Sequence, residues 1–287
     1  MAGTPVTSWL VSSAGVLLVL VVLRDIFHTL LHPVGNGRLS QVVVRAVWFV
    51  ARRGGTTGMR LAGPLSMLAV ISTWGSLTIL GWALLYLPHL PGSFSYSAGL
   101  DPAQRSPVVD ALYLSLVAGA TLGFGDLVPV AGWLRLVVPL EALVGFTLFT
   151  ASVTWILQTY PALAQRRALA VRLRLLTDQD PHPADLPASV LHGLAADVAA
   201  VRIDLQQYTE TYYFHDAEQT SLAAVLPVTL VLAAAAAAEP DEQRRLAGAV
   251  LLGALDELTG VLDQQYLKTG GTPQEIAAAY GRDHHQG

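Results

Sequence analysis

The apolar segment from Pro107 to Ala120 limits the fold of this chain more than any other. Ser106 suits an N-cap, Pro107 the first helical position and Asp110 the first turn, so a helix is predicted to begin here. About fourteen helical residues span about 21 Å, less than the roughly 30 Å of a bilayer core. A helix that stops halfway returns as non-helical backbone, which survives at membrane depth only when buried in protein or lining water. The segment therefore predicts a re-entrant loop.

The composition indicates a membrane protein. Of 287 residues, 53% are hydrophobic and 13% are charged, whereas soluble domains carry about 25% charged residues. Three apolar runs are long enough to cross a bilayer, at residues 9–31, 64–87 and 133–157. The chain has no cysteine, which excludes disulfides, thiolate metal sites and cysteine nucleophiles.

The stretch Thr121–Asp126 follows the short helix and reads TLGFGD. Two glycines alternate with bulky residues, and glycine tolerates positive φ, so such a run can turn its carbonyls toward one line. A row of inward carbonyl oxygens can replace the water shell of a potassium ion. One chain supplies one row, whereas the ion needs a ring of them, so the stretch also predicts an assembly of chains.

TLGFGD resembles the TVGYGD signature of tetrameric potassium channels, and the resemblance covers roughly residues 64–158. It implies a homotetrameric pore whose selectivity filter consists of Thr121, Leu122, Gly123, Phe124, Gly125 and Asp126. The resemblance assigns the K⁺-binding carbonyls to residues 121–124 and the innermost oxygen to the Thr121 hydroxyl. Asp126 would attract cations at the outer mouth or bond to nearby backbone, and the two roles are compatible.

The sequence departs from the family pattern around this filter. Phe124 replaces the usual tyrosine, so a hydroxyl that braces the filter from behind is missing, and Ala120 stands where a second threonine is frequent. Val117 and Leu114 stand where some members have a polar or aromatic brace. We expect K⁺ selectivity to survive these changes, because it rests on backbone carbonyls.

The third span contains further candidate site residues. Glu141 is costly inside a membrane unless paired, and we expect it to support the filter or the pore helix together with Arg135; a role in permeation is the alternative. Gly145 is a candidate gating hinge or a close-packing point. Three threonines are candidates for lining the cavity or for bonding to their own helix, at Thr147, Thr150 and Thr154.

The first span ends in polar residues. Asp25, His28 and His32 share one helical face, which could hold a metal or sense protons; the interpretation that we favour is an interfacial helix end where Arg24 pairs with Asp25. Residues 38–63 carry five arginines and no acid, which is typical of a basic helix on the membrane surface. A voltage sensor is the alternative, but the arginines lack its three-residue spacing.

Charge asymmetry predicts the domains and the topology. Residues 1–177 carry twelve arginines and five acids, and residues 178–287 carry sixteen acids and five basic residues. We expect an N-terminal transmembrane helix with a basic interfacial helix (1–63), a pore domain (64–160) and a cytoplasmic helical domain (161–287). The basic clusters place the N-terminus outside the plasma membrane and the C-terminus in the cytoplasm.

The acidic part of the chain has helical periodicity. Helices are predicted at residues 186–213, 218–238 and 240–267, and a last one after Thr272-Pro273, where Glu275 completes a helix start. The alanine-rich run 222–238 is predicted to lie in a cytosolic bundle, with a fourth membrane span as the alternative. No glycine-rich βαβ pattern indicates a nucleotide-binding domain.

The sequence as a whole predicts an all-α membrane protein with three transmembrane helices, a re-entrant pore helix and filter, and a helical cytoplasmic domain. The predicted function is passive K⁺ conduction by a homotetramer in contact with membrane lipids. No enzymatic activity, no cofactor beyond K⁺ as permeant ion and no nucleic acid are expected, and a cytoplasmic ligand or protein is left open. The gating stimulus is also open: protons at His28 and His32, a ligand, or none. The alternative function is a membrane-anchored sensor or adaptor with a non-conducting pore fold and a partner-binding acidic domain.

Overall fold

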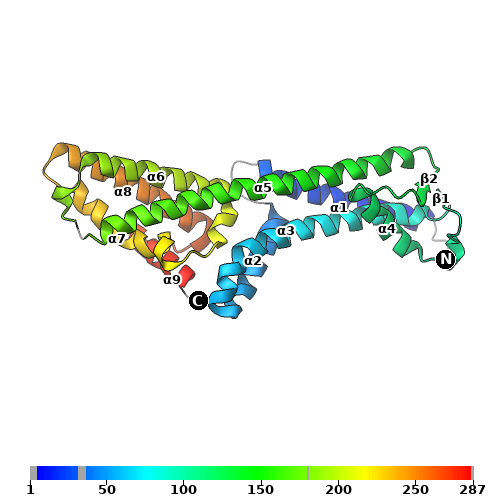
Figure 1. Ribbon diagram of the computed structural model, residues 1–287, viewed down its shortest axis with the longest axis horizontal. Helices are drawn as coiled ribbons and strands as arrows, with labels where there is room; N and C mark the ends of the chain where they lie inside the picture. Colours follow the sequence, from blue (N-terminus) through cyan, green and yellow to red (C-terminus); the bar gives the residue numbers. More distant parts are fainter. Residues whose placement is uncertain (1–4, 32–36, 180, 286–287) are drawn as a thin grey trace. The chain divides into compact units, whose positions relative to one another are not determined.

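The computed structural model describes residues 5–31, 37–179 and 181–285, and these are mostly helical (Figure 1). The helices are α1 (Pro5–Leu31), α2 (Arg38–Ala51), α3 (Gly55–Tyr86), α4 (Pro107–Gly119), α5 (Leu134–Thr177), α6 (Ala188–Gln207), α7 (Leu222–Ala237), α8 (Glu242–Leu262) and α9 (Pro273–His285), and the strands are β1 (Phe94–Tyr96) and β2 (Leu127–Pro129). Among the described residues, three helices are long and apolar enough to cross a membrane, over Val6–Leu30, Thr57–His89 and Leu134–Thr177. The predicted all-α membrane protein with three spans is confirmed.

The described residues divide into two compact units. The first unit contains α1, residues 37–41 and residues 68–156, and the second contains residues 42–67 and 157–285. This division differs from the three domains predicted from the sequence, because residues of α2 pack with the C-terminal helices instead of forming a part with α1.

The core of the first unit surrounds the short helix α4. Ala111 and Leu114 of α4 are buried together with Trp82 and Tyr86 of α3 and Leu134 of α5. Helix α4 therefore packs against both long helices. Such burial in protein is what a helix that ends at membrane depth requires. Its length and bounds agree with the prediction within one residue, although the Ser106 side chain makes no capping hydrogen bond.

A two-stranded sheet that the sequence analysis missed lies beside α4 in this unit (Figure 1). β1 and β2 pair antiparallel, with Phe94 opposite Pro129 and Tyr96 opposite Leu127. Strands of three residues carry too little period-two alternation to be recognised in a sequence. The sheet connects the segment before α4 to the segment after it.

The structure corrects the interpretation of Asp25. The carboxylate does not pair with Arg24 but is buried, and it accepts hydrogen bonds from the Trp74 indole at 3.0 Å and the Ser40 hydroxyl at 2.6 Å. It also accepts the backbone N–H groups of Leu39 and Ser40 at 2.9 and 3.1 Å, so it caps the first turn of α2. His32, the third member of the predicted polar face, lies outside the described residues.

The start of the second long helix also differs from the prediction. The apolar run predicted to cross the membrane begins at residue 64, but α3 begins at Gly55 and contains Pro64 in its interior. Met59 and Ala62 are fully buried against Trp48 of α2. These tertiary contacts extend the helix upstream and override the local start signal.

The second unit is a helical bundle whose core comes from the end of α5 and from α6 to α9. Helix α7 is central to it: Leu226, Leu230 and Ala233 are completely buried. The prediction that residues 222–238 lie in a bundle is confirmed, and at 16 residues α7 is shorter than a membrane span. The helix α9 begins with the expected capping box, because Thr272 and Glu275 exchange side-chain to backbone hydrogen bonds.

Helix α2 has two different faces. Val44 and Trp48 are buried, and the Trp48 ring packs against Tyr213 at a centroid distance of 5.3 Å within the second unit. Val42 and Phe49 are exposed on the other side. The predicted membrane-surface position of this helix therefore stays a prediction, and it concerns the face that carries Val42 and Phe49, because the Trp48 face packs against protein.

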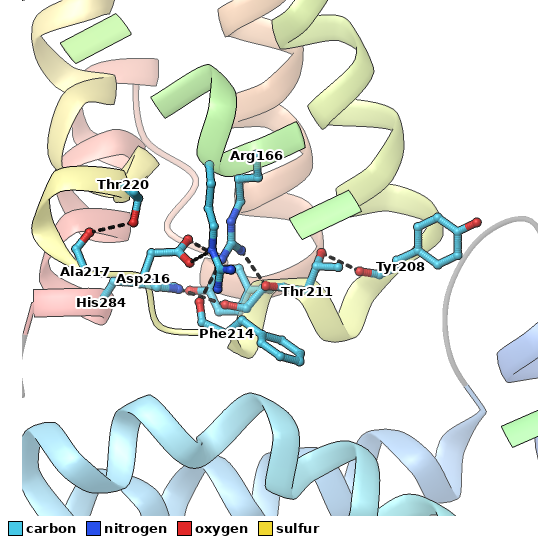
Figure 2. Close-up of polar contacts among 10 residues, drawn as sticks. Arg166, Tyr208, Thr211, Phe214, Asp216, Ala217, Thr220 and His284 are labelled. Carbon is cyan, nitrogen blue, oxygen red and sulfur yellow. Dashed lines mark hydrogen bonds and ion pairs between the residues drawn. The ribbon is translucent and has the colours of Figure 1, made fainter. Parts of the chain in front are cut away.

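A buried arginine joins the end of α5 to the loop between α6 and α7. Figure 2 shows the Arg166 guanidinium donating to the carbonyl oxygens of Thr211 and Phe214 at 2.5 and 2.9 Å and to the Asp216 carboxylate at 2.5 Å. Arg166 is 2% exposed, so these bonds satisfy a charge that water does not reach. The loop is thereby held to one side of α5.

Candidate functional site

The loop Thr121–Asp126 leaves the C-terminal end of α4 with an unusual backbone. φ is positive at Thr121, Gly123 and Gly125, with values of 58°, 57° and 76°, and negative at the residues between them. Alternation in the sign of φ can turn successive carbonyl groups toward one side of a loop, and glycine adopts the positive values most readily. Thr121 is β-branched, and its left-handed conformation costs about 1–2 kcal/mol.

The N–H groups at the start of this loop are bound back to the helix. The amides of Thr121 and Leu122 donate to the carbonyl oxygens of Ala118 and Val117, each at 2.9 Å. These bonds satisfy carbonyls that the helix end would otherwise leave without donors. The loop is thus anchored through its amides, and its own carbonyls remain available.

No donor in the described part of the chain reaches the carbonyl oxygens of residues 121–124. The same residues are exposed, and even the apolar Leu122 and Phe124 have exposed fractions of 57% and 65%. A row of free backbone oxygens is costly without a ligand or water. The loop therefore presents an oxygen-rich binding surface that a cation can satisfy.

The outer end of the loop is braced by a tyrosine of α4. The Tyr113 hydroxyl donates to the Asp126 carboxylate at 2.5 Å, while the other carboxylate oxygen accepts the Leu127 amide at 3.1 Å. The Ser97 amide donates to the Asp126 carbonyl oxygen at 2.9 Å. The predicted backbone-bonding role of Asp126 is observed, and a hydroxyl does reach this loop although Phe124 lacks one.

Tyr113 was not predicted from the sequence as a support for the loop, because in the family pattern the brace lies at other positions of the helix. Tyr113 is the only tyrosine of α4, and a tyrosine hydroxyl that is partly buried usually finds a hydrogen-bond partner.

A second polar cluster supports the start of α4. Asp110 is buried and accepts hydrogen bonds from Tyr96 of β1 and from the Arg105 guanidinium, each at 3.0 Å. Burial and the bond to Asp110 raise the pKa of Tyr96 to about 12, so its hydroxyl remains a donor at neutral pH. Asp110 thus connects the sheet to the first turn of α4, beyond its predicted effect on the helix dipole.

Glu141 of α5 joins α5 to α3 and α4. It is 1% exposed and accepts the Tyr86 hydroxyl of α3 at 2.7 Å and the Ser115 hydroxyl of α4 at 2.5 Å. The expected pairing with Arg135 is corrected: Arg135 is exposed and makes no ion pair with it. Six residues along a helix differ by about 120° around its axis, so the two side chains diverge.

Gly145 allows α5 to approach α4. A Cβ atom at Gly145 would overlap the carbonyl oxygen of Gly119, the last residue of α4, and would lie 2.8 Å from its carbonyl carbon. α5 runs without interruption through this position. The geometry is that of a close-packing point, and a hinge function stays a prediction.

The three threonines of α5 bond to their own helix. Their hydroxyls donate to the carbonyls four residues earlier at 2.8, 3.0 and 2.9 Å, for Thr147, Thr150 and Thr154 in that order. All three side chains are also exposed in the single chain. Back-bonding is therefore observed, whereas their place in a cavity stays a prediction.

Comparison with known proteins finds a similarity to ion channels over the residues that contain the loop 121–126. Residues 70–160 match a protein-family model described as "Ion channel". The uncharacterized membrane protein YdjJ of Bacillus subtilis (strain 168) is 31% identical over 161 residues, which are 55% of this chain and 46% of the relative. The chain thus spans less than half the length of that relative. No solved structure matches.

Proposed function

We propose that the protein is a potassium-selective channel of the plasma membrane, and the match of residues 70–160 to the ion-channel family model supports this. K⁺ passes down its electrochemical gradient through a homotetrameric pore, with the loop 121–126 as the selectivity filter. The N-terminus is outside and the second unit faces the cytoplasm, as the arginine clusters favour. The chain carries out no chemical reaction, and K⁺ is the permeant ion.

The observation that carries the proposal is that no donor within the described residues reaches the carbonyl oxygens of residues 121–124. Rings of backbone carbonyls replace the hydration shell of K⁺ in potassium-selective pores. The alternating sign of φ at Thr121, Gly123 and Gly125 fits such a row. If these carbonyl oxygens coordinate a cation, they need no hydrogen-bond donor from the protein.

The exposed surface of α5 supports the assembly. Only 11% of its most apolar stretch is buried in the single chain, and exposed Phe146 and Phe149 lie on the same part of the helix as the threonines. Lipid covers some of this surface, but one row of carbonyls does not surround an ion. A ring of four copies supplies the missing oxygens and covers the inner side of α5.

Buried hydrogen bonds behind the loop suit a rigid filter. Glu141 connects α3, α4 and α5 through two hydroxyl groups, and Tyr113 holds Asp126 at the outer end. Functional sites need such supporting contacts to hold their geometry. We therefore assign Glu141 to filter support, and we leave it out of the permeation path because it is buried within one subunit.

The test is cation uptake by liposomes that contain the purified protein. We expect Rb⁺ uptake that Ba²⁺ blocks and that Na⁺ does not replace, from particles with the mass of four chains. Gly123→Ala should abolish uptake, because its φ of 57° is in the left-handed region. Gly99→Ala is the matched control, since Gly99 also has a positive φ, of 92°, but lies in the segment before α4 with no atom near its Cβ position.

Two results would reject the proposal. Uptake that Gly123→Ala leaves unchanged would remove the filter from the permeation path. A folded, inserted protein that carries no Rb⁺ and purifies as a monomer or dimer would support the alternative function, a membrane-anchored adaptor whose acidic helical domain binds a partner.

A further inference from the structure

A polar pocket of about 310 Å³ lies in the first unit where the end of α1 meets the start of α2. Its wall includes Val21, Arg24, Asp25, His28, Gly37 and Arg38. This volume is within the range of about 300–1,000 Å³ that is typical of small-molecule sites. The pocket lies outside residues 70–160, so the match to the ion-channel family assigns nothing to it.

The charges on the pocket wall favour an anion. Arg24 and Arg38 are exposed, and within the described residues neither forms an ion pair. The one acidic side chain on the wall, Asp25, is engaged elsewhere, since four donors from Trp74, Ser40 and Leu39 occupy its two oxygens. The two guanidinium groups therefore keep their hydrogen-bond donors for a ligand.

Buried hydrogen bonds hold the two helices that form the pocket wall together. Asp25 is 6% exposed and holds the first turn of α2 against α1. The Thr29 hydroxyl adds a second connection, because it accepts the Gly37 amide at 3.0 Å and donates to Ser40 at 3.1 Å. A Cβ atom at Gly37 would overlap the Asp25 carboxylate. Arg38 is thus fixed opposite the helix that carries Arg24.

The position of the pocket along α1 favours a lipid headgroup over a soluble anion as the ligand. The membrane span of this helix ends at Leu30, so Arg24 and His28 lie on its last two turns. Val21 on the wall is an exposed apolar side chain within the span. A ligand in this pocket meets hydrocarbon on one side and basic groups on the other, as a phospholipid does at the edge of a bilayer.

We propose that this pocket binds the phosphate of an anionic phospholipid headgroup between Arg24 and Arg38. Guanidinium groups bind phosphate through paired, charge-assisted hydrogen bonds. Basic pockets between helices at the cytoplasmic membrane surface are typical sites for such headgroups. Val21, the exposed apolar side chain on the pocket wall, provides a contact for an acyl chain.

Native mass spectrometry of the full-length protein tests this directly. The protein would be released from vesicles that contain equal amounts of phosphatidylglycerol and phosphatidylcholine, and the retained lipid would be weighed. We expect phosphatidylglycerol to be retained preferentially. The double variant Arg24→Gln/Arg38→Gln should weaken its retention about 30-fold, if each arginine contributes as a typical basic residue at a membrane surface does.

Matched variants separate the pocket from general attraction of charge. Arg53→Gln/Arg60→Gln removes the same charge from two exposed arginines outside the pocket and should leave retention within about twofold. An equal loss in both pairs would overturn the proposal. The variant Arg24→Lys/Arg38→Lys serves if Arg24→Gln/Arg38→Gln does not fold. It keeps both positive charges but loses the paired hydrogen bonds of the guanidinium groups, so it should reduce lipid retention measurably. Unchanged retention would overturn the proposal.

A soluble anion is tested in a further arm. Millimolar inorganic phosphate should neither displace the retained lipid nor raise the thermal midpoint of lipid-free protein, whereas phosphatidylglycerol should raise it. Stabilisation by phosphate alone would show that the ligand is a free anion and would reject the lipid. Because these measurements use no ion flux, their outcome is independent of the proposed conduction of K⁺.

Discussion

Replacing Gly145 by alanine tests whether this glycine is a packing point. A Cβ atom here would overlap the carbonyl oxygen of Gly119 and lie 2.8 and 3.0 Å from its carbonyl carbon and Cα. These are backbone atoms at the end of α4, so no side chain can rotate away to make room. Overpacking of this kind costs about 1–3 kcal/mol. Because Ala120 and Thr121 follow Gly119 directly, any shift of Gly119 also displaces the loop 121–126.

Gly75→Ala is the matched control for this experiment. Gly75 lies inside α3 with no atom within 4 Å of its Cβ position. Both substitutions gain about 1 kcal/mol of helix propensity, so the difference between them isolates the steric term. We expect Gly145→Ala to be less stable than Gly75→Ala by about 1–3 kcal/mol.

The assay is thermal unfolding of the purified protein in detergent, together with Rb⁺ uptake in liposomes. Gly145→Ala should lower the unfolding midpoint and reduce uptake, and Gly75→Ala should do neither. Equal stability of the two variants would refute the packing argument. Equal stability combined with altered opening of single channels would instead support the hinge predicted from the sequence.

Three further predictions concern the second unit and use unfolding of the full-length protein. Arg166→Leu should destabilise it by about 3 kcal/mol because the carbonyl oxygens of Thr211 and Phe214 lose a buried donor while Asp216 keeps only Arg167, whereas Arg172→Leu removes an exposed ion pair and should cost at most about 1 kcal/mol; equal costs would contradict the burial argument. Burial lowers the pKa of His284 to about 4, so the unfolded chain binds more protons below pH 6.5, and stability should fall by up to about 3 kcal/mol between pH 6.5 and 4. His284→Gln should flatten that dependence, and an unchanged slope would reject the assignment. Thr272→Ala removes the capping box of α9 and should lower the stability of this helix by about 1 kcal/mol. Amide hydrogen exchange in α9 should then be faster. Unchanged exchange would show that tertiary packing alone stabilises the start of α9.

Local signals predicted the parts of the fold that depend on local physics. The length of the apolar segment 107–120 predicted a helix that stops inside the membrane, and α4 ends at Gly119. The resemblance to pore-loop channels is confirmed over residues 70–160. The capping box at Thr272 and Glu275 was recognised because all its groups lie within four residues.

The contacts that position the site could not be read in the same way, because their partners are distant in the chain. Tyr86 and Glu141 are separated by 55 positions, and Asp25 and Trp74 by 49. The sequence indicated that a carboxylate at position 141 needs a partner, but several hydroxyl groups were equally available. Arg135 was chosen for its charge, although the helix directs the two side chains apart.

The conformation of Thr121 has a consequence for how the loop 121–126 folds. Its side chain disfavours the left-handed backbone that the loop requires, so a free peptide of this sequence would not hold the shape. The surrounding helices must already be in place before the loop can settle into it. Among the described segments of the first unit, this loop should therefore be the last to become ordered during folding and the first to lose its conformation on heating.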